Sequence, residues 1–523
     1  MEITWLPVLT ITIIFIITIL KLIRHGRSFP NLPPGPTPLP FLGNIILLRK
    51  YSSSFYALIH DLHVHYGPIF TFHFGSRRVI FIAGHSLAHQ ALAHHGAAIA
   101  DRPPASITNK ILYSNHITIF TAFHGPNWSL LRRNLISETF HPSHLRLLSD
   151  ARRWSLNSLV SRLKSHSQGG AAAVRLVDHI RLTLVEISVF MCFGLKLEEE
   201  RIKALAELLH QVLLHSSRQN KLNQYPLKLG KILYPNLWKE ISTIRNKMET
   251  AIIPLIKARL DERQREIEQR NNELESESET ETETERVLPY LDTLLNLHLP
   301  EENRKMEEGE IISLCAEFLN GIVHTTLMVM QWAMANIVKY PEIQEKVYTE
   351  INQAMDQSSS KEQVTEEDIK KMPYLKAVIM ETLRRHPPGY LSLPHLAMKE
   401  VVLDGKFVVP KKTTVHFVAA EMARNGEVWK EPMEFRPERF LTKEAEKVEV
   451  EALIGRKEIR FMPFGGGRRI CPGVGISMLH LQYFVANLVW FFKWDAVDEV
   501  DLEEKIEVSI VMKTPLQARI SPR

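Results

Sequence analysis

The chain has 523 residues, of which 45% are hydrophobic and 24% are charged, a composition that excludes a disordered or fibrous protein and fits a globular one with a large core. Its net charge of +5 is small for this length, and its Lys and Arg residues are scattered among Asp and Glu, so no nucleic-acid partner is indicated. The three cysteines, Cys192, Cys315 and Cys471, lie far apart, which argues against a disulfide framework and favours a reducing compartment.

The N-terminal segment is apolar. No charge occurs from Ile3 to Leu20, a length about sufficient to cross a bilayer, and basic residues follow between Lys21 and Arg27. A secretory signal would carry positive charge before the apolar stretch and a small-residue cleavage site after it, and neither is present. We therefore predict a single uncleaved transmembrane anchor over residues 1–23, with a buried core helix as the alternative. The basic flank places the body of the protein in the cytosol.

A basic and proline-rich hinge is predicted over residues 24–44. The prolines between Pro30 and Pro40 fix φ and lack an amide donor, so this stretch should be stiff and extended and should hold the body at a set angle to the membrane. Residues 45–523 are predicted to form one catalytic domain, in which helical periodicity is broken by short strands such as a hairpin over Val401–Val409 with an Asp–Gly turn. The expected fold class is mainly α with small β-sheets (α+β).

Two segments in the second half of the chain have helical spacing. The long apolar stretch from about Glu310 to Lys339 predicts a central helix. Further on, Glu381 and Arg384 lie three residues apart and therefore on one helical face. Taken alone, such a pair is usually a solvated ion pair on the surface.

The most informative segment runs from Phe464 to Gly473 and contains Cys471. Its three consecutive glycines let the backbone approach a flat cofactor closely, and Arg469 can neutralise an anionic group. The apolar run after Gly475 predicts a helix whose N-terminal end stabilises a thiolate. Although a single cysteine is more often a small buried hydrophobe than a ligand, these neighbours suit an iron ligand.

This segment resembles the cysteine-ligand loop of the cytochromes P450, Phe-x-x-Gly-x-Arg-x-Cys-x-Gly, at Phe464, Gly467, Arg469, Cys471 and Gly473. The resemblance implies the cytochrome P450 fold and a haem-binding catalytic domain. It implies haem b as cofactor, with the Cys471 thiolate as the axial iron ligand that favours O–O cleavage. It also implies that Phe464 and Arg469 belong to the haem site, with Arg469 near a haem propionate.

Further elements follow the order of the same family. Glu381 and Arg384, together with Arg439, resemble its Glu-Arg-Arg triad, which implies a structural lock behind the haem. Trp128 and Arg132 resemble its Trp-x-x-x-Arg helix, which implies contacts with a propionate. His395 lies where similar plant enzymes carry a further propionate contact, with a surface histidine as the alternative.

Other details are similar to plant microsomal A-type members, including the segment from Pro33 to Pro36. This likeness implies a single-pass protein of the endoplasmic reticulum membrane whose catalytic domain faces the cytosol. It also implies NADPH-cytochrome P450 reductase as the electron donor.

The sequence departs from the family pattern in the central helix. Most members carry Ala/Gly-Gly-x-Asp/Glu-Thr, whereas this chain has Gly321-Ile322-Val323-His324-Thr325. The β-branched Ile322 is expected to narrow the pocket where a small residue normally leaves room. His324 replaces the acid that relays protons together with the threonine; a histidine can also relay protons, or it can fill space and hydrogen-bond a neighbour. Thr325 itself can instead bond back to the carbonyl four residues earlier.

Three functions are compatible with these residues. The first is a monooxygenase that inserts one oxygen atom from O₂ into a hydrophobic small molecule, with Thr325 and His324 as the proton-handling residues. The second is a haem-thiolate isomerase, dehydratase or cyclisation enzyme that needs no O₂ activation, and the third is a non-catalytic haem or ligand-binding protein.

The segments expected to line the substrate pocket are largely apolar, which favours a hydrophobic ligand. A plant specialised metabolite is the substrate class that the resemblance suggests. These segments are Ser106–Phe123, Leu319–Thr326, Gly389–Leu393 and Ser509–Val511.

Overall fold

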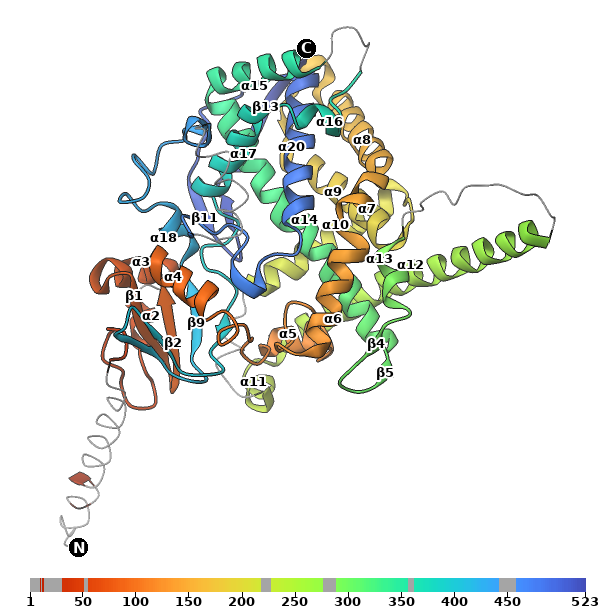
Figure 1. Cartoon of the computed structure of the whole chain (residues 1–523). Coiled ribbons are helices and arrows are strands. Elements are labelled where there is room, and N and C mark those ends of the chain that lie inside the picture. The colour runs from red at the N-terminus through yellow and green to blue at the C-terminus, as the bar shows by residue number, and fades with distance from the viewer. Residues whose placement is uncertain are drawn as a thin grey trace, which may run out of the picture. The chain divides into compact units, whose positions relative to one another are not determined.

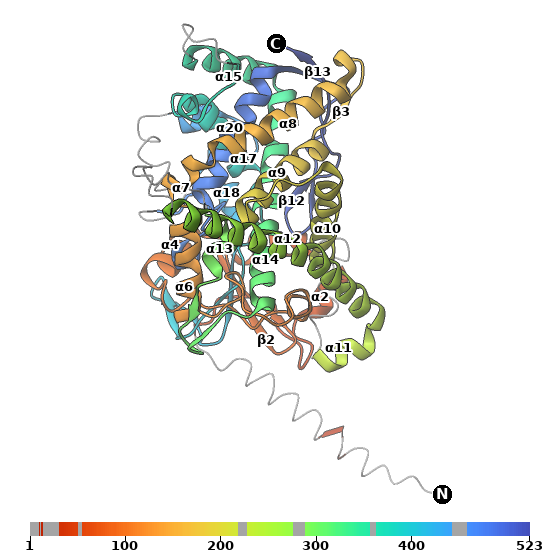
Figure 2. The same ribbon diagram turned by 90° about the vertical axis from the view of Figure 1, so that its right-hand side faces the viewer.

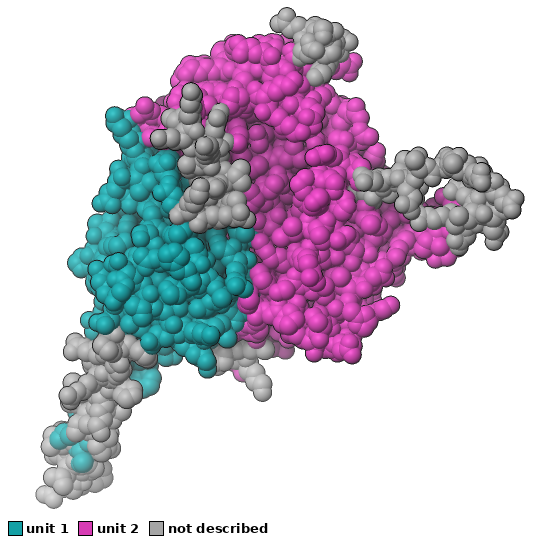
Figure 3. All heavy atoms as spheres, in the orientation of Figure 1, with its two compact units in different colours: residues 1–103, 389–433, 447–470 teal, residues 104–388, 434–446, 471–523 magenta. Residues whose placement is uncertain are grey.

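The computed structural model describes residues 10, 12, 13, 31–50, 55–217, 227–275, 288–355, 362–441 and 458–523. The chain divides into two compact units, coloured in Figure 3. The first unit comprises residues 1–103, 389–433 and 447–470, and the second comprises residues 104–388, 434–446 and 471–523. Apart from Thr10, Thr12 and Ile13, the predicted anchor lies outside the described residues, so it stays a prediction, as does a single catalytic domain over residues 45–523.

The first unit is built on a four-stranded sheet with the order β1-β2-β9-β6. Strands β1 and β2 are antiparallel, and β9 runs parallel to β2. One face of this sheet covers a core that includes Ile80, Ile82, Val415 and Phe417. The elements of this unit are α2 (Ile45–Lys50), α3 (Phe55–Tyr66), β1 (Ile69–Phe74), β2 (Arg77–Ile82), α4 (His85–His89), η1 (Gln90–His94), β6 (His395–Leu396), β7 (Val401–Leu403), β8 (Phe407–Val409), β9 (Thr414–Phe417), α18 (Ala419–Ala423) and η6 (Gly467–Arg469).

The predicted hairpin is confirmed, because β7 and β8 pair as antiparallel strands. Its turn has positive φ at both Asp404 (51°) and Gly405 (64°). These are the two residue types that tolerate such a turn between short strands.

The proline-rich segment is fastened to the first unit. The Thr71 amide and hydroxyl in β1 donate to the carbonyls of Pro34 and Pro33, at 2.7 Å and 2.9 Å. The side-chain amide of Asn44 donates to the carbonyl of Pro36 at 3.2 Å. A proline carbonyl accepts hydrogen bonds, but proline has no amide hydrogen to donate. An extended proline segment can therefore accept hydrogen bonds from a strand without donating any in return. The segment therefore lies along β1 as part of the folded body.

We predict that Gly35→Ala destabilises this unit. A Cβ at Gly35 would lie 2.0 Å from the Thr71 carbonyl oxygen, so the segment must move away from β1, at a cost of about 1–3 kcal/mol. Gly426→Ala is the matched control, because a Cβ there meets nothing within 4 Å. Thermal unfolding of the full-length protein should give a lower midpoint for Gly35→Ala only; equal midpoints for the two variants would contradict the docked segment.

The second unit is mostly helical and carries small sheets of order β10-β13-β3, β11-β12 and β4-β5. Its helices are α5 (Ile107–Leu112), α6 (Pro126–Asn134), η2 (Leu135–Thr139), α7 (Pro142–Leu147), α8 (Ser149–Ser167), η3 (Gln168–Gly170), α9 (Leu176–Phe193), α10 (Glu199–Ser217), α11 (Leu227–Leu233), α12 (Pro235–Glu275), α13 (Tyr290–Leu294), α14 (Glu308–Lys339), α15 (Pro341–Ala354), α16 (Glu366–Ile369), α17 (Pro373–Arg385), η5 (Pro437–Phe440) and α20 (Val474–Phe491). Its strands are β3 (Val174–Arg175), β4 (His298–Leu299), β5 (Arg304–Lys305), β10 (Phe492–Ala496), β11 (Glu504–Ile506), β12 (Ile510–Met512) and β13 (Gln517–Pro522). The prediction of a mainly α fold with small sheets is confirmed.

Helix α14 is the predicted central helix and lies at the centre of the second unit. It contacts α9, α17 and α20 (Figure 1), and α12 crosses it (Figure 2). A capping box formed by Glu307 and Glu310 begins the helix, and Pro341 follows its end. In length and composition both α14 and α20 could cross a membrane, but 72% and 61% of their most apolar windows are buried. Their apolar residues therefore form the protein core.

Candidate functional site

The glycine-rich loop before Cys471 is shaped by positive φ angles. Gly465 and Gly467 have φ of 71° and 63°, a region that favours glycine. A Cβ at Gly467 would also lie 2.8 Å from the carbonyl oxygen of Leu92. The loop then forms η6, which buries Arg469 so that its Nε donates to the carbonyl of Ala100 at 2.7 Å, while Phe464 is half-buried. The glycines therefore allow the tight turn that orients Arg469.

Cys471 lies just before α20 in the second unit, and the helix begins at Val474 as the sequence predicts. The Gly473 amide donates to the Cys471 sulfur at 3.3 Å. Burial raises the pKa of the Cys471 thiol, while this hydrogen bond and the nearby Arg132 charge lower it. The sulfur is thus held where an additional cation, such as a metal ion, would complete the stabilisation of a thiolate.

Trp128 and Arg132 share one face of α6. The Arg132 guanidinium lies 5.6 Å from the centre of the Trp128 ring, and Trp128 is buried. Burial lowers the pKa of Arg132, and the Cys471 sulfur opposes that shift. Within the second unit, α6 therefore supplies a cation to the surroundings of Cys471.

His395 is buried in β6, with only 4% of its surface exposed, so it is not a surface histidine. Its Nδ1 lies 2.9 Å from the Ile99 carbonyl oxygen, and because a carbonyl only accepts, Nδ1 carries the proton. Burial, followed by the charge of Arg102, lowers the pKa of His395 to about 3. The neutral ring therefore presents Nε2 as an acceptor, and a direct hydrogen bond from Nε2 to a carboxylate requires the protonated ring.

Glu381, Arg384 and Arg439 meet within the second unit. Arg384 binds both carboxylate oxygens of Glu381 at 2.7 Å and 2.8 Å, and Arg439 Nε donates to the same carboxylate at 3.2 Å. The Arg436 amide adds a fourth hydrogen bond at 2.9 Å. Since the Glu381 and Arg384 side chains are fully buried, this is not a solvated surface pair. The cluster joins α17 to the segment around η5.

We predict that Glu381→Gln strongly destabilises the protein. The variant leaves the buried Arg384 guanidinium without a counter-charge, which costs about 3–5 kcal/mol. The control is Glu434→Gln. The Glu434 side chain is 60% exposed, and its ion pair with Arg436 is long, with 3.9 Å between the nitrogen and oxygen atoms, so its loss should cost little. Urea unfolding followed by tryptophan fluorescence should show a large drop in the midpoint for Glu381→Gln alone. A midpoint equal to that of the control would refute a structural role for the cluster.

The altered segment of α14 has one open side. Gly321 and Thr325 are exposed, whereas Ile322 is buried, with 8% exposed. A Cβ at Gly321 would meet nothing within 4 Å, so there is free space beside the helix at this point. The Thr325 hydroxyl donates to the Gly321 carbonyl at 2.9 Å, which is the local hydrogen bond that threonines make in helices.

His324 points to a different surface from Thr325, since consecutive helical residues are about 100° apart around the axis. Its Nε2 lies 2.9 Å from the hydroxyl of Ser509, in the loop between β11 and β12. Burial lowers the pKa of His324 to about 3, with smaller contributions from His210 and Arg181. The histidine is therefore neutral near pH 7 and has a specific partner.

Glu317 is a further polar residue of α14 that the sequence did not single out. Its carboxylate accepts hydrogen bonds from the backbone amides of Ile119 and Phe120, at 2.9 Å and 2.7 Å. It thereby ties a segment expected to line the substrate pocket to α14. A lone acid in the apolar run of α14 was the only signal in the sequence.

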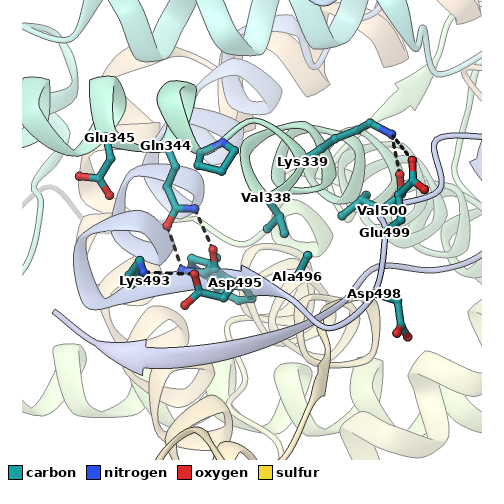
Figure 4. A pocket seen from close by; sticks show the side chains of 12 residues that line it. Val338, Lys339, Gln344, Glu345, Lys493, Asp495, Ala496, Asp498, Glu499 and Val500 are labelled. Atoms are coloured by element: carbon teal, nitrogen blue, oxygen red, sulfur yellow. Dashed lines mark hydrogen bonds and ion pairs between the residues drawn. The ribbon is translucent and has the colours of Figure 1, made fainter.

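A cleft of about 440 Å³ in the second unit contains none of the predicted site residues. Its polar groups bind one another. Lys493 pairs with Asp495 at 3.2 Å (Figure 4), and Gln344 exchanges hydrogen bonds with the backbone of Trp494. Within the described ranges, no group of three or more His, Cys, Asp or Glu side chains is arranged to hold a metal ion. This cleft is therefore not the candidate site.

Comparisons with known proteins identify relatives along the whole chain. The sequence model of the family described as Cytochrome P450 matches residues 33–521. The chain is 41% identical to Cytochrome P450 89A9 of Arabidopsis thaliana over 100% of both proteins. It is 27% identical to Oryzalexin D synthase of Oryza sativa subsp. japonica, over 95% of this chain and 94% of the relative. It is also 27% identical to Ent-cassadiene C11-alpha-hydroxylase 1 of the same plant, over 98% and 96%.

A solved structure has the same fold. It is a zebra fish cytochrome P450 with abiraterone, which matches with a TM-score of 0.70 over 90% of this chain and 99% of that one. The sequence identity is 21%, so this likeness bears on the fold alone.

Proposed function

The chain belongs to the cytochrome P450 family, and from this membership we propose that it inserts one oxygen atom from O₂ into a hydrophobic plant specialised metabolite. Its class is that of a cytochrome P450 monooxygenase with haem as cofactor. We further propose that NADPH-cytochrome P450 reductase supplies the electrons and that residues 1–23 anchor the enzyme in the endoplasmic reticulum membrane. The observation that carries the proposal is the sulfur of Cys471, held before α20 by an amide hydrogen bond.

The residues present fit a haem. The Cys471 sulfur receives the Gly473 amide and lies in the field of Arg132, a donor set suited to a thiolate ligand of iron. Arg132 and Arg469 are cations suited to the propionates, and Trp128 and Phe464 are candidates for apolar contacts with the ring. When bound, haem supplies the activation of O₂. The Nδ1–H of His395 is taken by the Ile99 carbonyl, so Nε2 is the ring nitrogen available for a propionate.

Thr325 and His324 take different parts in this proposal. The Thr325 hydroxyl, on the open side of α14, holds and passes a proton during catalysis. His324 remains neutral and binds Ser509, so its role is to position the loop between β11 and β12. A depressed pKa of about 3 makes His324 a poor proton donor near pH 7, because efficient acid–base groups have a pKa near the working pH.

The same observation favours a second candidate function. Because His324 stands in place of the acid that family members carry beside the threonine, and because it is engaged with Ser509, Thr325 has no neighbouring acid to relay protons. A haem-thiolate isomerase, dehydratase or cyclisation enzyme needs no such relay. The proposed class of substrate, a plant specialised metabolite, is supported by the names of two plant relatives, Oryzalexin D synthase and Ent-cassadiene C11-alpha-hydroxylase 1.

The proposed activity predicts products that depend on NADPH and O₂. We would express the full-length enzyme in microsomes with a plant reductase, incubate it with a plant metabolite extract and compare products by mass spectrometry. We expect products one oxygen atom heavier, which disappear without NADPH or O₂ and in Cys471→Ala. Products that need Cys471 but neither NADPH nor O₂ would replace the monooxygenase with the second candidate.

The role of His324 predicts a contrast between two variants. Gln can still hydrogen-bond Ser509 but cannot relay a proton through a ring, so His324→Gln should keep most of the activity and the same pH profile from about pH 5 to 8. His324→Leu loses the hydrogen bond and should change the ratio of products, as should Ser509→Ala. If His324→Gln lost activity about a hundredfold while the Ser509 variant behaved like the wild type, His324 would be the relay.

A further inference from the structure

Strands β11 and β12 form a short hairpin in the second unit. They pair as antiparallel strands, with Ile506 opposite Ile510. The Glu507 amide closes the connecting loop by donating to the Ser509 carbonyl at 2.9 Å. Because a two-stranded hairpin is only marginally stable by itself, the place of the β11–β12 hairpin depends on what it binds in the rest of the unit.

Helix α14 holds this hairpin at one end of its loop. His324 Nε2 lies 2.9 Å from the Ser509 hydroxyl, and Trp332 Nε1 donates to the Ile510 carbonyl at 3.0 Å. The Ile510 amide in turn donates to the Pro388 carbonyl, just after α17, at 3.2 Å. These contacts fall on two neighbouring residues of the hairpin. They therefore fix the start of β12 and leave the orientation of the hairpin to contacts elsewhere.

Glu504, at the start of β11, supplies such a contact. Its Oε1 lies 2.8 Å from His386 Nδ1 and accepts a hydrogen bond from Arg385 Nη1 at 3.1 Å. Because an ionised carboxylate only accepts, the Nδ1 of His386 carries the proton. The Glu504 side chain is only 15% exposed. These charge-assisted hydrogen bonds are therefore stronger than those of an ion pair on the surface.

The residues that hold the two ends of the hairpin are packed on each other. The ring of His386 lies parallel to that of Trp332, with ring centres 3.8 Å apart and an angle of 3° between the planes. Both side chains are buried. His386 binds Glu504 and Trp332 binds Ile510, so one stacked pair connects both ends of the hairpin to the core. A change at Glu504 can therefore reach the loop.

The other acids of the hairpin region differ from Glu504 in their partners. Glu503 is 59% exposed and pairs with the exposed Lys513 at 2.7 Å. Glu507 pairs with Lys505, which is also exposed, at 2.7 Å. Ion pairs of this kind contribute little to stability. Glu504 alone among these three acids binds the buried end of α17.

We propose that Glu504 is a positioning residue, which sets the place of Ser509 against His324 and thereby shapes the substrate pocket. Glu504 lies outside the segments expected to line that pocket, so it acts through the hairpin rather than on the substrate. The proposal rests on the proposed function, because Ser509–Val511 is one of the segments expected to line the pocket.

The test measures binding of 1-phenylimidazole to the full-length, haem-loaded enzyme. Its imidazole nitrogen coordinates haem iron and its phenyl ring enters the pocket, so binding is followed by the absorption spectrum of the haem. We expect Glu504→Ala to bind it at least about twofold more weakly than the wild type. Glu504→Gln keeps an oxygen that accepts the His386 hydrogen bond and should recover much of the loss. Glu503→Ala is the matched control and should bind like the wild type.

A double variant shows whether Glu504 acts through Ser509. Ser509→Ala alone should also weaken the binding of 1-phenylimidazole. If both residues act through the same contact, the double variant binds only slightly more weakly than the weaker single variant. Effects that multiply would show that Glu504 acts independently of Ser509 and would overturn the proposal, as would wild-type binding by Glu504→Ala.

Two features keep this test decisive. If Glu504→Ala does not take up haem, Arg385→Gln replaces it, because that variant weakens the same contact from a side chain that is 15% exposed. It should show a smaller loss of affinity in the same direction. Binding of 1-phenylimidazole needs haem but no turnover. The result therefore stands apart from the proposed reaction, which is judged by products that depend on NADPH and O₂.

Discussion

The second unit depends on one constraint, which is that α14 is a buried helix in contact with different surroundings on each of its sides. Its apolar residues bury against α9, α17 and α20, and that burial is the main favourable free energy of such a core. Every polar residue in the helix must then find a specific partner or an open space. Glu317 binds the amides of Ile119 and Phe120, His324 binds Ser509, and Thr325 faces the open side.

Other buried charged groups of this unit are paired with groups of opposite charge. Glu381 is surrounded by two guanidinium groups and a backbone amide, and Arg259 is paired with Asp292 at 2.7 Å. Such clusters contribute little net stability compared with apolar residues, but they make the fold intolerant of losing one member.

Much of the fold and part of the site follow from local sequence signals. The boundaries of α14, the β7–β8 hairpin and the helix after Cys471 are encoded by apolar periodicity, turn residues and capping groups within a few positions. The glycine loop and the Glu381 cluster were also visible as motifs. What local signals do not contain is the partner of a side chain. Ser509 lies 185 residues along the chain from His324, so the hydrogen bond between them could be seen only in the structure.

Tertiary burial explains two further surprises. For His395 the sequence left a propionate contact and a surface histidine open; its burial in β6 excludes the surface histidine, and the Ile99 carbonyl decides which nitrogen is protonated. Ile322 is buried while Gly321 and Thr325 form the open side of the helix, and that it narrows the pocket stays a prediction. Both outcomes depend on neighbours that periodicity alone does not specify.

The docking of the proline-rich segment on β1 also decides which N-terminal truncations leave the first unit intact. Since Pro33, Pro34 and Pro36 accept hydrogen bonds from Thr71 and Asn44, and Asn31 accepts one from Val408, these residues complete the first unit. A truncation that removes only the apolar N-terminus and begins before Asn31 keeps this edge of the sheet covered. One that begins at Ile45 exposes β1 as an uncovered edge, the kind of surface that promotes aggregation.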